Sequence, residues 1–258
     1  MIPNQSGSCL QQMEAGAFQI AEIAYPAGMR QRQHAHPDSG ITLIMAGSLE
    51  ETVARAHERA YALSVVVKPL DTEHANQVGN AGARTLQIRI GSHAFADELR
   101  LLGSWRWCHR GAIVREFLQV LRCFRTGSTN DVETAVFDLI GAAHHNVIDA
   151  GEPPCWLKHA RDQIDALLPA AVRVSDVARS ADVHPVYLAR QFRRFFGCSV
   201  TEYISARRMQ LAADLLAGST SLAGAAYDAG YADQSHLTRS FRNSVGVTPL
   251  AYRSLVRG

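Results

Sequence analysis

The spacing of apolar residues changes along the chain, from a strand-like pattern in the first part to a helical pattern in the rest. Within the first 95 residues, turn residues such as Pro26-Ala27-Gly28 separate short β-rich runs, of which the clearest are Gly40–Ala46, Ala62–Val67 and Thr85–Ile90. No helical stretch lies between these runs. The pattern therefore predicts an antiparallel β-barrel or sandwich over residues 1–95.

From about Phe95 the apolar residues recur at the spacing of a helix. One such segment covers residues 113–124 and a second runs from Val132 to Val147. We expect these segments to form an antiparallel helical pair within residues 96–153, through which the protein forms a homodimer. The segment Gly151-Glu152-Pro153-Pro154 ends this region, because glycine and proline interrupt helices.

Residues 154–258 show helical spacing almost throughout. The expected helices are Cys155–Leu168, Val174–Ser180, Pro185–Phe196, Val200–Ala217, Leu222–Ala229, Asp233–Ser244 and Pro249–Val256. The whole chain is thus predicted to be an α+β protein with a β-barrel at 1–95, a helical segment at 96–153 and an all-α domain at 154–258.

Charge divides the chain in the same way, although the net charge is only +2. Residues 1–153 hold 13 Lys and Arg against 16 Asp and Glu, whereas residues 154–258 hold 13 against 8. A basic part joined to a mildly acidic one is typical of a nucleic-acid binder with a separate sensing part. The chain lacks a long apolar stretch and a signal-peptide pattern, so we expect a cytoplasmic protein with no membrane partner.

The strongest signal in the sequence is an internal repeat at an offset of 49 residues. The matched pairs are Leu188 with Leu237, Arg190 with Arg239, Phe192 with Phe241, Arg193 with Arg242, Gly197 with Gly246, Ser199 with Thr248 and Tyr203 with Tyr252. A short helix and a turn precede each copy, so the pattern predicts two helix-turn-helix units. The helix between them has about 18 residues and a length of roughly 27 Å, which could place two recognition helices about one DNA turn apart.

The starts of the two recognition helices differ in their capping residues. Asp233 can accept hydrogen bonds from the amides of the following turn, and Pro185 suits the first helical position. His184 is a poorer capping residue than serine or aspartate. We therefore expect a weaker start in the first unit, and we expect the second unit to contribute much of the base specificity.

Residues 160–253 resemble the DNA-binding domain of AraC/XylS-type regulators, most clearly over GYADQSHLTRSFRNSVGVTPLAYR at 230–253. The resemblance implies binding to double-stranded promoter DNA, often as an activator that recruits RNA polymerase. The base-reading candidates carried over by position are Val186, Ala189, Arg190, Gln234, Ser235, His236 and Arg239. The candidates for phosphate contacts are Arg193, Arg194 and Arg242.

The N-terminal part resembles the two short motifs of cupin barrels. Gly28-x5-His34-x-His36 is followed by Gly47 and then by Pro69-x4-His74-x-Asn76. Three neutral imidazoles would suit Zn²⁺, Ni²⁺, Cu²⁺ or Fe²⁺. The glutamate of the enzymes' motif is absent, because Gly40 and Ile41 occupy its positions. The three histidines could therefore bind a metal, line the pocket of a small-molecule effector, or serve only the barrel structure.

Three functions remain open from the sequence. The first is a regulator that responds to a small-molecule or metal effector bound in the barrel, and not an enzyme. The second is a cupin metalloenzyme fused to a DNA-binding domain, against which the missing glutamate counts. The third is a constitutive DNA-binding regulator with a purely structural barrel.

Overall fold

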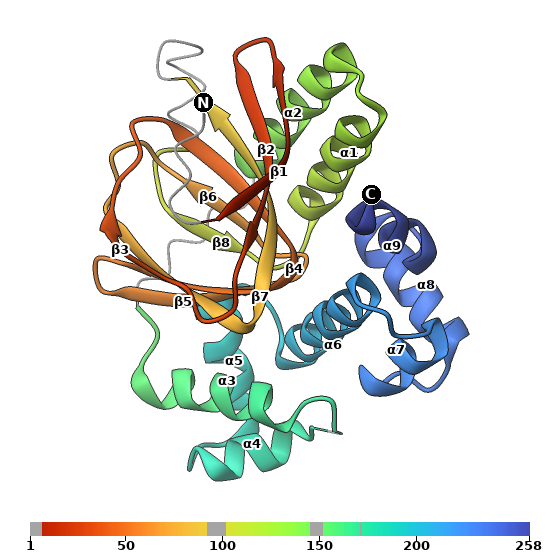
Figure 1. The fold of residues 1–258 in the computed structure, drawn as a ribbon. Coiled ribbons are helices and arrows are strands. Elements are labelled where there is room, and N and C mark those ends of the chain that lie inside the picture. Colours follow the sequence, from red (N-terminus) through yellow and green to blue (C-terminus); the bar gives the residue numbers. More distant parts are fainter. Residues whose placement is uncertain (1–6, 92–101, 145–151, 171) are drawn as a thin grey trace.

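The computed structural model describes residues 7–91, 102–144, 152–170 and 172–258. An antiparallel sheet comes first, and helices follow it (Figure 1). The α+β class and its order along the chain are thereby confirmed. The strands are β1 (Ser8–Ala15), β2 (Phe18–Tyr25), β3 (Arg30–His34), β4 (Ser39–Val53), β5 (Ala56–Tyr61), β6 (Val65–Lys68), β7 (His74–Ile90) and β8 (Arg106–Cys108). The helices are α1 (Ala112–Thr126), α2 (Thr129–His144), α3 (Cys155–Leu167), α4 (Val174–Ser180), α5 (Pro185–Phe196), α6 (Val200–Ala217), α7 (Leu222–Asp228), α8 (Gln234–Val245) and α9 (Pro249–Arg257).

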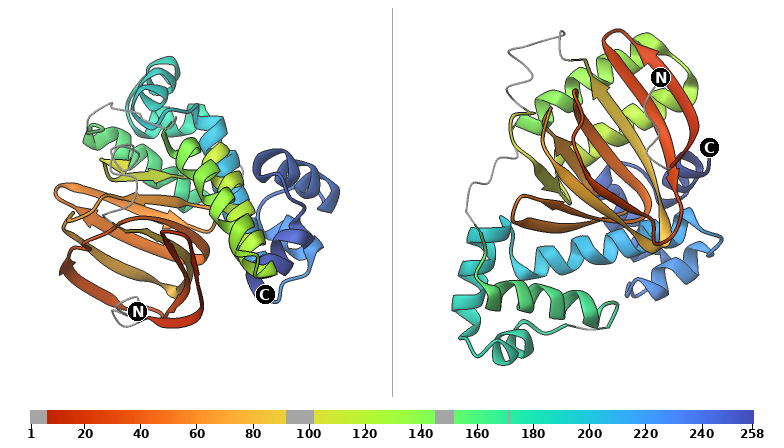
Figure 2. Two further views of the ribbon diagram at one scale, coloured as in Figure 1. Left: turned by 90° about the horizontal axis from the view of Figure 1, so that it is seen from above. Right: turned by 60° about the vertical axis from the view of Figure 1, so that its left-hand side comes forward.

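The eight strands belong to one sheet, in which β1-β2-β7-β4-β6-β8 follow one another while β3 pairs with β7 and β5 with β4. The long strands β4 and β7 pair with each other along most of their length, and each also pairs with strands on its other side. The sheet therefore curves strongly around its own interior (Figure 2). The histidine-bearing strands β3 and β7 pair at His34 and His74.

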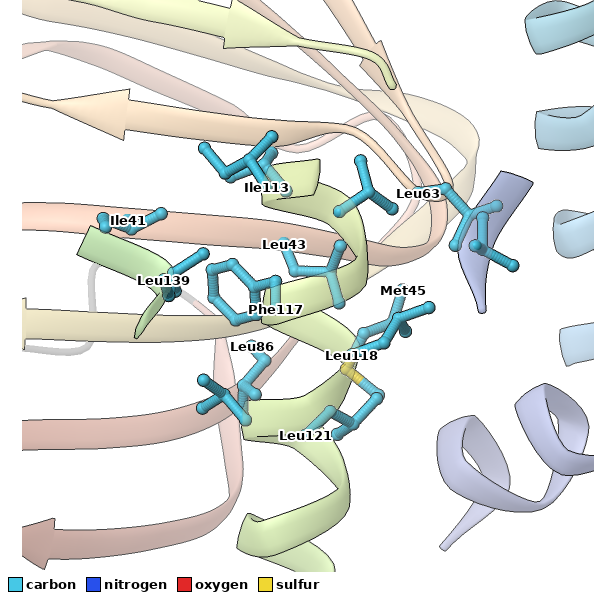
Figure 3. Packing of buried hydrophobic residues seen from close by; sticks show 14 of the residues in the cluster. Ile41, Leu43, Met45, Leu63, Leu86, Ile113, Phe117, Leu118, Leu121 and Leu139 are labelled. Carbon is cyan, nitrogen blue, oxygen red and sulfur yellow. The ribbon is translucent and has the colours of Figure 1, made fainter. Parts of the chain in front are cut away.

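Both faces of the central strands are apolar because both are covered. Leu43 and Met45 pack on α1 and α2, whereas Ile44 between them faces a second cluster with Val66 and Val78 inside the curved sheet. This explains the unbroken apolar run in β4, since a strand buried on both faces loses the alternation of a half-exposed one. Figure 3 shows Phe117 of α1 against the sheet. Burial of such a side chain contributes roughly 2–3 kcal/mol.

The sheet continues beyond the last strand run that the sequence indicates. The expected change to helix at Phe95 lies outside the described residues, and the first helix that follows begins at Ala112. Between them the short strand β8 pairs with β6, with Trp107 opposite Val66. Only three residues long and preceding a helix, β8 offers too few positions for a period of two to be visible in the sequence.

The helices of residues 152–258 agree with the predicted ones to within a residue or two at each end. Glycines in the left-handed conformation end both recognition helices, Gly197 with φ 64° and Gly246 with φ 79°. A complete capping box between Ser199 and Glu202 begins α6. None of the helices in the described ranges is both long enough and apolar enough to cross a lipid bilayer.

The helical part packs directly on the sheet. The fully buried Tyr252 of α9 donates its hydroxyl proton to the carbonyl oxygen of Met45 at 2.7 Å. The ladder between β4 and β7 shifts register between Ile44 and Ala46, so Met45 has no partner in it. The C-terminal helix therefore donates a hydrogen bond to the Met45 carbonyl, which the β-bulge leaves without a partner in the ladder.

A polar network joins the two parts at a second place. The carboxylate of Asp165 on α3 accepts hydrogen bonds from Arg207 Nε at 2.8 Å and from the Tyr203 hydroxyl at 3.0 Å, both on α6. The Arg207 guanidinium lies 3.4 Å from the ring centre of Tyr61 at the end of β5. Because Arg207 is only 6% exposed, its charge depends on these contacts rather than on water.

Candidate functional site

The first helix-turn-helix unit consists of α4, a tight turn and α5. Asp182 takes the left-handed conformation with φ 52° in the turn, and the amide of Val183 donates to the carbonyl of Ala178 at 3.0 Å. The side chain of Ala178 is fully buried and short, so it permits this close approach of the two helices. The short helix and the turn that the sequence predicts before the first recognition helix are confirmed.

The second unit repeats this arrangement with α7 and α8. Gly230 has φ 78°, and the amide of Tyr231 donates to the carbonyl of Ala226 at 2.9 Å. These two residues correspond to Val183 and Ala178 of the first unit at an offset of 48 rather than 49, as expected from the one-residue difference in turn length. The internal repeat in the sequence is thus a repeat in three dimensions.

The two recognition helices start as their capping residues predict. The Asp233 carboxylate accepts from the amide of His236 at 2.7 Å. In the first unit Nδ1 of His184 does accept from the amide of Val186, but at 3.3 Å, and Pro185 takes the first helical position. A hydrogen bond this long contributes less than the charge-assisted one at Asp233.

The predicted DNA-reading side chains lie on the outer faces of α5 and α8. The paired core residues Leu188 and Phe192, with Leu237 and Phe241 in the second copy, are fully buried. All ten candidates for base and phosphate contacts are exposed, namely Val186, Ala189, Arg190, Arg193, Arg194, Gln234, Ser235, His236, Arg239 and Arg242. Each unit thus holds its apolar side against the domain and its polar side toward solvent.

Tyr187 on the exposed face of α5 was not among the residues predicted from the sequence to contact DNA. This side chain is 45% exposed and stacks on Trp156 of α3, with ring centres 5.7 Å apart. Next to it Val186 is 68% exposed. Two adjacent exposed apolar side chains on a recognition helix are the signal that could have identified this surface, because globular domains seldom leave such pairs open to water.

The three predicted histidines lie together in the curved sheet. The ring centres of His34 and His74 are 4.2 Å apart, and that of His36 lies 4.9 Å from His34 and 5.2 Å from His74. One ring nitrogen from each can be chosen so that all three lie within 4.8 Å of one another. The motif spacing in the sequence thus corresponds to a real cluster.

Backbone hydrogen bonds fix which ring nitrogens face the cluster. Nδ1 of His34 lies 2.8 Å from the carbonyl of Arg32, and Nδ1 of His74 lies 3.0 Å from the carbonyl of Thr72. Since a carbonyl only accepts, both Nδ1 atoms carry a proton, so Nε2 is the nitrogen of each ring that can bind a metal ion. Nε2 of His74 is buried and has no hydrogen-bond partner among the residues that the structure describes.

The surroundings keep two of these rings neutral. Burial, and then the charges of Arg89 and Lys68, lowers the pKa of His36 to about 4. Burial, with Lys68 as the largest charge effect, lowers the pKa of His74 to about 3. Both imidazoles are therefore unprotonated at neutral pH, which is the form that binds metal ions.

The cavity beside the cluster is small, about 50 Å³, and its walls include His34, His36 and Asp38. Asp38 follows His36 by two residues in the sequence, and it lies near Arg89, whose charged form it favours. Within the described residues, the group whose atoms converge contains the three histidines and not Asp38. The site is therefore an all-imidazole donor set.

A tryptophan pair and a buried ion pair beside the histidines could not be predicted from the sequence. The ring of Trp105 lies 4.6 Å from that of His74 and 6.1 Å from that of Trp107. The buried carboxylate of Glu51 accepts from Trp107 Nε1 at 2.9 Å and pairs with Lys68. Strand β8, which holds Trp107, thus connects the wall of the histidine site to the start of α1.

Comparison with known proteins assigns the C-terminal part. Residues 177–254 match the family described as "Helix-turn-helix domain". The chain is 33% identical over 101 residues to the regulatory protein PocR of Salmonella typhimurium, and 30% identical over 98 residues to the lactose operon transcription activator of Staphylococcus xylosus. Residues 177–254 thus form a helix-turn-helix domain similar to that of AraC-like regulators, behind an N-terminal antiparallel sheet. The resemblance inferred from the sequence is confirmed.

These alignments span 39% and 38% of this chain, and 33% and 35% of the two relatives. The chain thus covers about a third of the length of the relatives, and the names of both describe regulators rather than enzymes. Among solved structures, ToxT from Vibrio cholerae O395 is similar over 94% of this chain and 99% of its own, with 14% identity and a TM-score of 0.40. The AraC-like transcriptional activator CuxR is similar over 77% of this chain and 78% of its own, with 12% identity and a TM-score of 0.44.

Proposed function

We propose that the protein is a sequence-specific DNA-binding transcription regulator whose helices α5 and α8 enter successive major grooves of promoter DNA. The observation that carries this proposal is the paired exposure of polar side chains on two repeated recognition helices, above fully buried leucine and phenylalanine residues. The excess of basic residues in 154–258 supports it, because phosphate neutralisation supplies much of the affinity for DNA.

The exposed side chains of the two helices suit different bases. Arg190 and Arg239 can donate to guanine edges, and Gln234 can pair with adenine. Ser235 and His236 add hydrogen-bonding groups in α8. In α5 the remaining candidates, Val186 and Ala189, offer only apolar contact, for example to a thymine methyl group. We therefore assign most of the base specificity to the second unit.

The other arginines suit the DNA backbone. Arg193 and Arg194 line a shallow hollow on α5 together with Arg190 and Ser199. Arg242 holds the position of Arg193 in the second copy of the repeat. Contacts of this kind position the domain on the duplex and carry no sequence information by themselves.

Two matched variants test the division between base and phosphate contacts. Arg239→Ala is expected to weaken binding to a selected site by about 1–3 kcal/mol and to relax preference at one base pair, whereas Arg242→Ala should weaken selected and random duplexes alike and reduce the salt slope by about 1. Quantitative gel shifts on both duplexes at several salt concentrations measure this. An equal loss on both duplexes for Arg239→Ala would remove its base-reading role.

For the sheet domain we propose a divalent transition-metal ion, Zn²⁺, Ni²⁺, Cu²⁺ or Fe²⁺, held by His34, His36 and His74. Nε2 of His74 is buried and has no hydrogen-bond partner within the described part of the chain, and the rings of His36 and His74 are neutral; both observations fit such a group. When bound, the ion would supply a positive charge that three neutral donors share. A cavity of about 50 Å³ has room for a few water-sized groups and not for a large organic effector.

Metal analysis of protein purified without a His-tag tests this site. We expect close to one equivalent of metal in the native protein and far less in the variants His34→Ala and His74→Ala. Gel shifts of the native protein with and without a chelator then separate a sensed metal from a structural one. A metal-free protein with unchanged DNA binding in both variants would leave the alternatives of a small effector pocket or a constitutive regulator.

Dimerisation and activation complete the proposal. Helix α1 is covered by the sheet on one side and contacts α8 and α9 on the other, so α2 offers the open surface for a homodimer, where Phe137 is 42% exposed. Activation through RNA polymerase is supported by the names of two relatives, which describe activators. Sedimentation at several concentrations and transcription in vitro test these two points.

A further inference from the structure

The segment that leads from β8 into the first turn of α1 lies between the two helix-turn-helix units. This junction segment, Arg110–Arg115, belongs to the N-terminal part of the chain and contains the first residues of α1. A cavity of about 620 Å³ is lined by this segment, by α6 and by α8. In sequence the two units are joined only through α6, whereas in space the junction segment lies next to the ends of both α5 and α8.

Arg110 holds the first unit. Its guanidinium donates a hydrogen bond of 2.6 Å to the carbonyl oxygen of Gly197, the residue that ends α5. The other terminal nitrogen of Arg110 lies 4.0 Å from the Glu202 carboxylate at the start of α6. A cation at the carboxyl end of a helix is favourable because the last carbonyl groups there have no helical partner.

Arg115 lies beside the end of the second unit. Its side-chain carbons lie beside Gly246, the residue that ends α8, so that a Cβ placed on Gly246 would meet Cδ of Arg115 at 3.5 Å. The aliphatic part of the Arg115 side chain faces Gly246, and Arg115 shares the wall of the cavity with the last residues of α8. No acidic partner lies within ion-pair distance of Arg115 among the residues that the structure describes.

The two contacts are equivalent in the repeat, because Gly197 and Gly246 are matched at the offset of 49 residues. One short segment of the N-terminal part is thus hydrogen-bonded to the end of α5 and lies beside the end of α8. The segment is itself held in place, since it continues from β8 in the sheet and the buried side chains of Ile113 and Val114 follow within it.

We propose that the junction segment fixes the separation of α5 and α8 and thereby determines how many base pairs may lie between the two half-sites. Arg110 and Arg115 are then positioning residues for specificity. Each additional base pair moves the second groove by about 3.4 Å and turns it by about a tenth of a turn, so small changes in separation matter. This inference rests on the proposed function, since it requires that both helices engage DNA.

The test uses the full chain and a DNA duplex obtained by site selection with the wild-type protein. Three duplexes are made, with the selected spacing and with one base pair added or removed between the two contacted segments. Dissociation constants are measured for the wild type, the double variant Arg110→Ala/Arg115→Ala, and Arg122→Ala, an exposed arginine of the same helix, as control for charge. Circular dichroism checks that each variant is folded.

We expect the wild type and the Arg122→Ala control to prefer the selected spacing by at least about tenfold, the size of an ordinary base-pair mismatch. The double variant should keep most of its affinity for the selected spacing and lose most of the preference. Arg115→Met should retain the preference, because its side chain preserves the apolar contact with Gly246, whereas Arg115→Ala should not.

Two results would overturn the inference while leaving the proposed function intact. If the double variant keeps the full spacing preference, the junction segment does not set the separation. If it binds all three duplexes more weakly by the same factor, the arginines act only through DNA phosphates. A wild-type protein that selects no sequence at all would instead refute the proposed function, and the inference with it.

Discussion

Replacing Tyr252 by phenylalanine removes one hydroxyl group from the contact between the helical part and the sheet. The side chain is fully buried, and its hydroxyl is 2.7 Å from the Met45 carbonyl oxygen, which the bulge in β4 leaves without a ladder partner. In Tyr252→Phe this carbonyl stays buried without a donor. An unsatisfied buried acceptor costs about 1–3 kcal/mol, and the ring keeps its packing. We expect the free energy of unfolding to fall by about that amount.

Urea unfolding of the full chain, followed by circular dichroism and by tryptophan fluorescence, measures the loss. The control is Tyr227→Phe, since Tyr227 on α7 is 82% exposed and its replacement should change the midpoint very little. A loss below about 0.5 kcal/mol for Tyr252→Phe would refute the reasoning, because it would show that the Met45 carbonyl finds another donor, such as water, at little cost.

Three further predictions concern charge and protonation. Asp165→Ala should destabilise the protein by about 3 kcal/mol in urea, because it leaves the buried Arg207 without its carboxylate; a loss no larger than that of Arg179→Ala on the exposed face would contradict this. Added Zn²⁺ should raise the thermal midpoint of the metal-free protein, and His34→Ala should abolish the shift; an equal shift in the variant would exclude the site. Metal-free protein should lose stability as the pH falls from about 6.5 toward 4. In this range His36 and His74 bind protons in the unfolded chain but stay unprotonated in the folded protein, because folding lowers the pKa of both. A urea midpoint that stays constant or rises between pH 7 and 5 would contradict it.

The helical half of the fold could be predicted almost residue by residue because its signals are local. Caps, left-handed glycines and the 3.6-residue period act within a few positions of the chain, and the left-handed turns at Asp182 and Gly230 are equally local. The internal repeat gave independent support, because the same helix-turn-helix arrangement is predicted twice. Capping strength at His184 was also predictable, because imidazole is a weaker acceptor than carboxylate.

The sheet and the histidine site were predictable only in part. Motif spacing brought the three histidines together correctly, but the neighbours that set their environment come from distant strands. Trp105 and Glu51 act through tertiary contacts that no local pattern indicates. The same holds for Arg110, which in the sequence is one arginine among many and in the structure donates a hydrogen bond to the carbonyl oxygen of Gly197.

Helix α6 packs both against the helices of the second helix-turn-helix unit and against the sheet. Its residues Met209, Ala212 and Leu216 share one buried cluster with Met45 and Leu63 of the sheet domain. A fragment expressed from residue 154 onward would therefore present this apolar stripe to water and would tend to aggregate. We expect limited proteolysis to yield no stable, soluble C-terminal fragment, so DNA-binding assays and fusion proteins should be built on the full-length chain.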